Sequence, residues 1–232
     1  QSYGPCFEMA AKAGITCFAT GPGSSDAIGG TFAAVNHGKR IDNMILKYPI
    51  AMKCAFGENP KRRYMTSRMS TRMTNAALIR EALQKAALYM AKKRPPVMTS
   101  PSCLLLIKNP EILILFLKGE LPLKAHAHQA NDIFTAIRIA KEFHTKLTLE
   151  HVTEGHLIVE ELVKENLLSC RSNLGHATKV ELLNKSWTTP ASWQKLAAMF
   201  PLFPMHLLPA AQPALYAGMA MKAGMDPYDA LR

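Results

Sequence analysis

The chain has 232 residues, 48% of them hydrophobic, and a formal net charge of +11. This length can bury the core of one α/β domain, so we interpret residues 1–232 as a single domain. A membrane span is excluded, because polar residues and a proline at 108–111 divide the apolar run 103–117 into halves far short of about 20 residues.

Cysteine usage points to a reducing environment. The five cysteines lie far apart, and no CxxC pair occurs. An odd count in a chain of this size argues against a disulfide framework. Cys17 and Cys54 sit in apolar runs, which predicts buried thiols. No signal peptide opens the sequence, so we expect a cytoplasmic protein.

The positive charge gathers at residues 61–63, at Arg68 and Arg72, and at residues 92–94. Such a cluster either forms a surface for nucleic acid or another acidic partner, or solvates helix faces and a loop. Aromatic residues do not interleave with the basic run, as stacking on single strands requires. We favour solvated helix faces and expect neither a nucleic-acid partner nor membrane association.

In chain order, the first half begins with a predicted helix at 5–13, which Gly14 ends, and a buried strand at 15–20. The glycine-rich segment 21–30 either presents backbone amides to an anion or forms a tight loop. We favour the loop, because no phosphate-binding motif matches. The remaining elements predicted in this half are weaker strands at 31–35 and 43–46, a better strand at 51–56 and the clearest helix at 74–92.

The second half alternates strands and helices more regularly. Its predicted elements are a helical turn at 111–117, a strand at 121–125, a helix carrying the apolar positions 133, 136, 137 and 140, a strand at 146–150, a helix at 157–166, a strand at 167–170, and helices at 191–197, 214–223 and from 227. This alternation predicts a parallel sheet with helices outside, and both an open doubly wound sheet and a closed barrel fit it.

Two histidines follow consecutive predicted strands, His126 after 121–125 and His151 after 146–150. The helix between them makes a βαβ unit, so both imidazoles should lie at the carboxyl ends of neighbouring parallel strands. Neutral imidazole is a good metal ligand, although a single histidine on an apolar strand is more often a core residue. Glu58, just past the strand 51–56, is positioned to add an oxygen ligand, and His128 should face the same side as His126.

Four segments resemble the amidohydrolase superfamily, and most closely its imidazolonepropionase-like metal-dependent members. They read GPGSSDAIGG, AMKCAFGENPKR, LKGELPLKAHAHQANDIFTAIRIAKEF and LTLEHVTEGHLI. The resemblance implies a (β/α)8 TIM barrel that holds one or two divalent metals, usually zinc. It places the metal ligands of the fourth, fifth and sixth strands at Glu58, His126 and His151, and puts His128 in the substrate pocket.

The sequence also departs from the family pattern. No HxH pair lies upstream of Gly21, where the first strand of the family supplies two ligands. Met199 and Phe200 stand where an aspartate and a histidine are expected, and we expect residues 1–232 to lack the family's flanking β-sandwich. A barrel without its first strand has an open seam, which we expect a missing segment or a second copy of the chain to cover.

These features support two functional hypotheses. The first is a metal-dependent hydrolase that cleaves C–N bonds of a cyclic amide or other small amide through a metal-activated water. The second is a catalytically inactive barrel of the same lineage that serves as a structural or binding protein. The sequence leaves open whether the chain is an enzyme or a pseudoenzyme, because the HxH pair and the aspartate expected near Met199 are missing.

Overall fold

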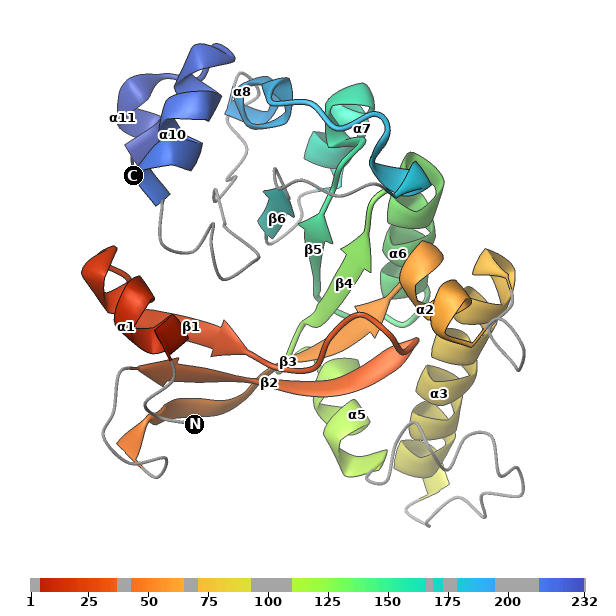
Figure 1. Ribbon diagram of the computed structural model, residues 1–232. Helices are drawn as coiled ribbons and strands as arrows, with labels where there is room; N and C mark the ends of the chain where they lie inside the picture. The colour runs from red at the N-terminus through yellow and green to blue at the C-terminus, as the bar shows by residue number, and fades with distance from the viewer. Residues whose placement is uncertain are drawn as a thin grey trace.

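The computed structural model describes residues 5–36, 43–64, 71–92, 110–165, 169–172, 179–194 and 213–231. Its strands form one six-stranded sheet in chain order (Figure 1). The strands are β1 (Cys17–Thr20), β2 (Ile28–Asn36), β3 (Ile45–Ala55), β4 (Leu123–Ala127), β5 (Leu147–His151) and β6 (Ser169–Ser172).

Helices separate the strands of the second half of the chain. The α-helices are α1 (Pro5–Lys12), α2 (Glu58–Arg63), α3 (Arg72–Lys92), α5 (Pro110–Leu117), α6 (Ala130–Glu142), α7 (Val159–Lys164), α8 (Thr188–Gln194), α10 (Pro213–Lys222) and α11 (Pro227–Leu231). Two 3-10 turns, η2 (Gly155–Leu157) and η3 (Val180–Leu182), lie beside the strand ends. No helix in the described part of the chain is both long and apolar enough to cross a membrane.

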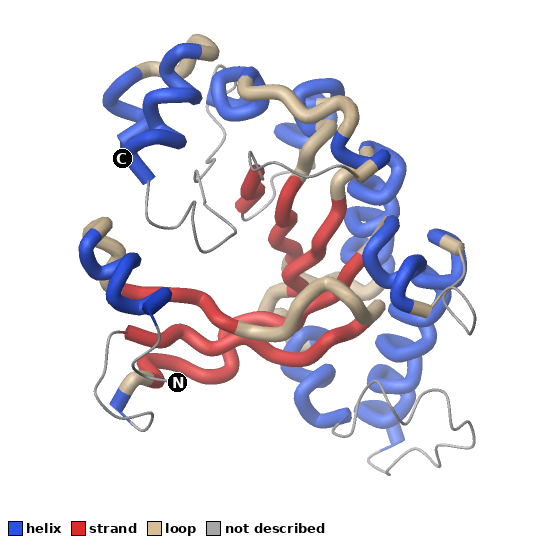
Figure 2. The backbone as a smooth tube through the Cα atoms, viewed as in Figure 1, coloured by secondary structure: helices blue, strands red, loops and turns tan. Residues whose placement is uncertain are grey.

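The sheet has an antiparallel and a parallel half. Strands β1, β2 and β3 pair antiparallel, whereas β3 to β6 pair parallel. The fold is therefore mixed α/β, and its sheet curls without closing among the described residues (Figure 2). The expected eight-stranded barrel is thus confirmed only in part. The antiparallel start follows from chain length, because residues 37–44 are too few for the crossover that parallel strands need.

The first strand differs from its prediction. We expected a buried strand at 15–20, but β1 has exposed residues at both ends and half-exposed residues between them, and Cys17, predicted to be buried, is exposed. Among the described strands, β1 pairs only with β2, and none of its residues belongs to the main core. Cys54, by contrast, is buried as predicted, and its burial raises the pKa of the thiol to about 12.

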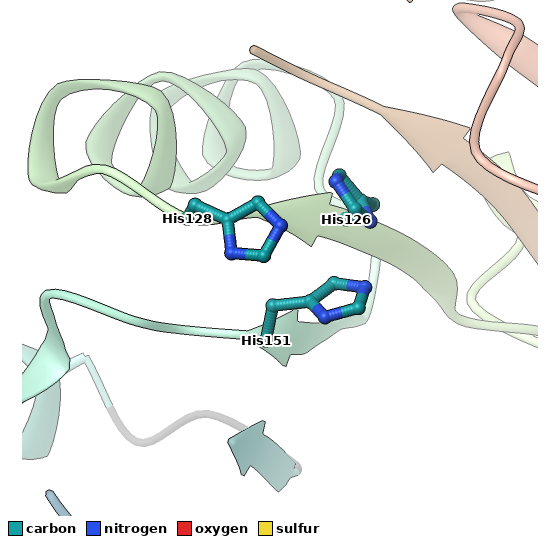
Figure 3. Close-up of side chains that lie close together, drawn as sticks. All are labelled: His126, His128 and His151. Atoms are coloured by element: carbon teal, nitrogen blue, oxygen red, sulfur yellow. The ribbon is translucent and has the colours of Figure 1, made fainter. Parts of the chain in front are cut away.

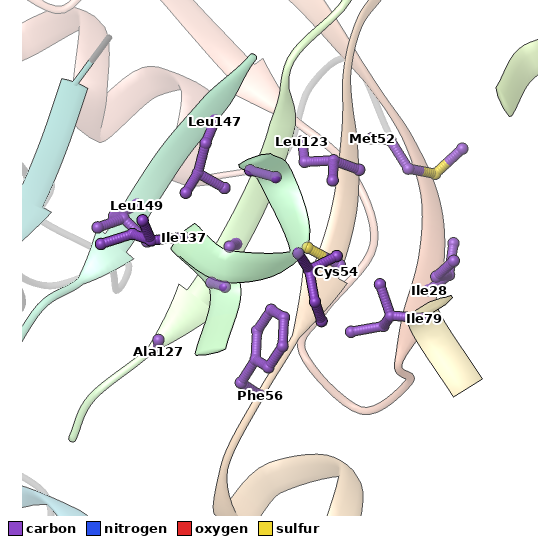
Figure 4. Packing of buried hydrophobic residues seen from close by; sticks show 14 of the residues in the cluster. Ile28, Met52, Cys54, Phe56, Ile79, Leu123, Ala127, Ile137, Leu147 and Leu149 are labelled. Carbon is purple, nitrogen blue, oxygen red and sulfur yellow. The ribbon is translucent and has the colours of Figure 1, made fainter. Parts of the chain in front are cut away.

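The main core lies between the parallel strands and helices α3, α5 and α6 (Figure 4). Alternate residues of β4 and β5 face these helices, including the fully buried Ala125 and Leu149. Helix α6 contributes Ile133, Ile137 and Ala140 to this core, which are part of the apolar stripe predicted from the sequence. Full burial of each large aliphatic side chain stabilises the fold by about 1.5–3 kcal/mol. Because this period-two pattern commits one sheet face to the core, the other residues of the strands must line the concave face.

Most predicted helices are confirmed, with shifted boundaries. The helix expected at 157–166 begins as the 3-10 turn η2, leaving Leu157 exposed, and continues as α7. Helix α8 begins two residues before Pro190, which a first helical turn tolerates because its missing N–H has no partner there. Met199 and Phe200 lie outside the described residues.

Candidate metal site

Three buried histidines meet at the carboxyl ends of β4 and β5 (Figure 3). One nitrogen from each of His126, His128 and His151 lies within 4.8 Å of the others. The ring centroids are 4.1 Å apart for His126 and His151, 4.7 Å for His126 and His128, and 4.5 Å for His128 and His151. The predicted proximity of His126 and His151 is therefore observed, and His128 joins them.

Strand phase brings two of these side chains together. His126 alternates with the core residues Ala125 and Ala127, so it faces the concave side of the sheet. His128 follows the end of β4 in the same phase, as expected from the period of two. One strand thus supplies two imidazoles to one point.

His151 reaches the same point only through an irregular backbone. It shares the phase of Leu147 and Leu149, both in the core, so a regular strand would point it toward the helices. Instead, φ is +77° at His151 and +41° at Val152. Left-handed conformations at non-glycine residues cost about 1–3 kcal/mol each and cluster at functional sites. This local strain accompanies a ring that lies against His126.

Two histidines of the cluster, His126 and His128, have the neutral state that a metal ligand requires. Burial lowers the pKa of His126 well below its usual value, and the neighbouring imidazoles of His151 and His128 add to this effect. Burial, together with the Lys179 and Lys53 ammonium groups, lowers the pKa of His128 to about 3. Both imidazoles are therefore neutral at pH 7, with lone pairs for a cation.

A hydroxyl orients His128. Its Nδ1 lies 2.6 Å from Thr153 Oγ1, in the turn that follows β5. A metal-bound imidazole donates its second N–H to such an acceptor, which fixes the ring and its tautomer. If Nδ1 donates to Thr153, the Nε2 lone pair is left to face the cluster.

Asn59 makes a competing contact with His126. Its Nδ2 lies 3.1 Å from His126 Nε2, and Lys179 Nζ donates a hydrogen bond to Asn59 Oδ1. Because lysine only donates, this bond sets the orientation of the amide and points Asn59 Nδ2 at the imidazole as a donor. Metal binding through His126 Nε2 therefore requires Asn59 to release that lone pair.

The cluster of possible metal ligands among the described residues consists of the three histidines and does not include Glu58. Glu58 opens α2 directly after β3, as predicted, but its carboxylate pairs with Arg62 at 3.1 Å on the partly exposed side of that helix. A different carboxylate, Glu181 of η3, lies beside the histidines, with Oε1 3.6 Å from His128 Nε2. The sequence analysis did not single out Glu181, because residues 180–184 are too short a segment for a periodic pattern.

Arg72 lies beside the Glu181 carboxylate and a second buried carboxylate, that of Asp132. Arg72 Nε bonds to Asp132 Oδ2 at 3.0 Å, and Arg72 Nη2 lies 3.9 Å from Glu181 Oε2. Burial raises the pKa of both carboxyl groups, while Arg72 opposes that rise. One arginine is thus shared between two buried acids at the edge of the site.

A layer of charged side chains lies on the same concave face. Its residues come earlier in strands β3, β4 and β5 than the strand-end histidines. Lys53 and Lys124 both pair with Glu150, Lys124 Nζ at 2.7 Å from Oε1. Their side chains are only 3%, 8% and 11% exposed, respectively. The layer carries one more positive than negative charge, and it links strands β3, β4 and β5.

No protein-family model matches the chain, and no curated protein matches it. Among solved structures, the chain is similar to the crystal structure of an amidohydrolase from Thermotoga maritima MSB8, with a TM-score of 0.89 and 31% sequence identity. The match covers 99% of this chain but 61% of that one, so this chain spans less than two thirds of its neighbour's length. The resemblance noted in the sequence is confirmed for the fold.

Proposed function

Because this chain has an amidohydrolase-like fold, we propose that it carries the metal site of a hydrolase that cleaves C–N bonds in a cyclic amide or other small amide. The observation that carries this proposal is the convergence of three buried imidazoles at the carboxyl ends of adjacent parallel strands. Parallel α/β folds place their chemistry at this edge.

The residues fit a divalent metal, and we propose zinc. Zinc accepts three imidazole ligands and keeps a further position for water or substrate. We propose His126, His128 and His151 as these ligands, so that His128 binds metal rather than lining the substrate pocket. A metal held there supplies Lewis acidity, which polarises an amide carbonyl and lowers the pKa of water.

The protein's own groups have supporting tasks. Thr153 holds His128 by its Nδ1 and leaves the other nitrogen facing the cluster. The main-chain N–H of Ala130 donates to Glu154 Oε2 at 2.8 Å, which ties the turn after β5 to the start of α6. Burial of all three histidines keeps bulk water away from the cluster, and it keeps His126 and His128 neutral.

The experiment compares His151→Ala with His144→Asn, which changes an exposed histidine in the turn after α6. After zinc loading and desalting, wild type and His144→Asn should retain about one equivalent of metal, and His151→Ala almost none. Hydrolysis of a panel of N-acyl amino acids, dipeptides and cyclic amides should follow the metal. Absence of metal from wild type, or equal metal in His151→Ala, would overturn the proposal.

The second candidate is an inactive barrel with a structural or binding role. It is favoured by Met199 and Phe200, which stand where the family has an aspartate and a histidine. The same experiment separates the candidates, because a metal-loaded wild type without turnover on the whole panel would support the inactive protein.

A further inference from the structure

We infer that Glu181 is a fourth protein ligand of the metal held by the three histidines. The inference rests on the proposed metal site and goes beyond it, because it recruits a carboxylate from η3, outside the strands. It makes the donor set three imidazoles and one carboxylate.

The first support is a distance. Glu181 Oε1 lies 3.6 Å from His128 Nε2, which exceeds the usual hydrogen-bond range of about 2.7–3.2 Å. Two ligand atoms bound to one tetrahedral zinc at about 2.0–2.1 Å lie roughly 3.4 Å apart. In Figure 3, one nitrogen of the His128 ring faces the other two imidazoles. The carboxylate therefore stands at the spacing of a neighbouring ligand, next to the nitrogen that would bind the metal.

The second support is an unsatisfied atom. Glu181 is 1% exposed, and its Oε1 has no hydrogen-bond partner among the described residues. Leaving a buried polar atom unpaired costs about 1–3 kcal/mol, and more when the group is charged. A cation between Oε1 and the imidazoles would satisfy this oxygen, which no donor of the described residues reaches.

The third support is that the other oxygen is held in place. The main-chain N–H of Glu58 donates to Glu181 Oε2 at 2.9 Å, and Arg72 lies beside it. Gly57 makes room for this arrangement, because a Cβ there would lie 2.8 Å from Oε2 and 3.0 Å from Asp132 Oδ2. Groups that orient a ligand in this way are typical of metal sites. The carboxylate thus presents Oε1 to the cluster at little further entropic cost.

The test measures zinc affinity with a competing fluorescent chelator in wild type, Glu181→Gln and Glu181→Asp. Glu161→Gln, an exposed carboxylate on α7, is the control. Glutamine keeps the shape of the side chain and an acceptor for the Glu58 N–H but removes the negative charge. Aspartate keeps the negative charge but, being one methylene shorter, moves it away from the histidines. We expect both Glu181 variants to bind zinc at least tenfold more weakly and the control to match wild type. Replacing zinc by Co²⁺ should change the visible spectrum of Glu181→Gln, since a ligand is lost.

The outcomes separate this inference from the proposed function. A wild type without zinc affinity would reject both. Tight binding by wild type with unchanged affinity and cobalt spectrum in the Glu181 variants would reject only the fourth ligand, and would mean that Oε1 meets water instead. Circular dichroism of the metal-free proteins establishes that each variant is folded, and Glu181→Asp provides the measurement where Glu181→Gln does not fold.

Discussion

Replacing Glu150 by glutamine should destabilise the fold strongly, because it leaves two buried ammonium groups without their counter-charge. Lys53 and Lys124 both pair with this carboxylate on the concave face of the sheet. The substituted amide would accept a hydrogen bond from one lysine but present donors to the other. The change keeps the volume of the side chain, so the charge is the quantity tested.

The expected loss is about 3–5 kcal/mol, the usual effect of removing one partner of a buried ion pair. For a chain of this size, that corresponds to a decrease in Tm of roughly 6–20 °C, at about 2–4 °C per kcal/mol. The pH dependence has a definite sign. Burial opposes ionisation of Glu150, but the two lysines outweigh it and lower its pKa. Its contribution is therefore present above pH about 4.3 and lost as the pH falls further.

Urea unfolding at pH 7, followed by circular dichroism, measures this loss. The control is Glu142→Gln, which removes the partner of Arg80 at a site 40% exposed and should change stability by less than about 1 kcal/mol. Replacing Lys53, Lys124 and Glu150 together by Met, Met and Leu should recover most of the loss. A Glu150→Gln effect no larger than that of the control would refute the reasoning.

Two further predictions concern the histidines. Asn59→Ala should tighten zinc binding about fivefold, because removing a hydrogen bond worth about 1 kcal/mol frees His126 Nε2; equal or weaker binding in a chelator competition would contradict this. Burial lowers the pKa of His126 and His128, so these histidines take up protons when the protein unfolds at acidic pH. The unfolding free energy should therefore fall as the pH drops from about 6.5 toward 3, by up to about 1.4 kcal/mol per pH unit for each histidine. His128→Asn should reduce that slope in urea titrations across this range, and an unchanged slope would show that His128 does not remain neutral in the fold.

The positions of the three histidines at neighbouring strand ends could be predicted from the sequence, because they depend on the order of the elements and on the alternation of residues along a strand. The run from 121 to 151 contains a strand, an amphipathic helix and a strand, each recognisable from its own periodicity. A βαβ unit places the ends of its strands side by side, so the strand ends that carry His126 and His151 had to be neighbours. The same period of two aligned His128 with His126.

Other parts of the site could not be predicted in this way. Alternation alone would turn His151 into the core, and only the positive φ at the end of β5 accompanies its position against His126. Glu58 follows a strand as expected, yet its carboxylate pairs with Arg62, and the buried carboxylate beside the cluster is Glu181. Side-chain rotation and loop placement decide such contacts, and neither leaves a periodic pattern in the sequence.

By itself the sequence determined the alternating elements, the helix-facing stripe of α6 and the two strand-end histidines, because these depend on residues a few positions apart. The tertiary structure alone decided that the sheet begins antiparallel, that Asn59 reaches His126 and that Glu181 lies against His128. Those contacts join residues 53 to 67 positions apart. They depend on how loops pack across the sheet edge, and local periodicity carries no information about that packing.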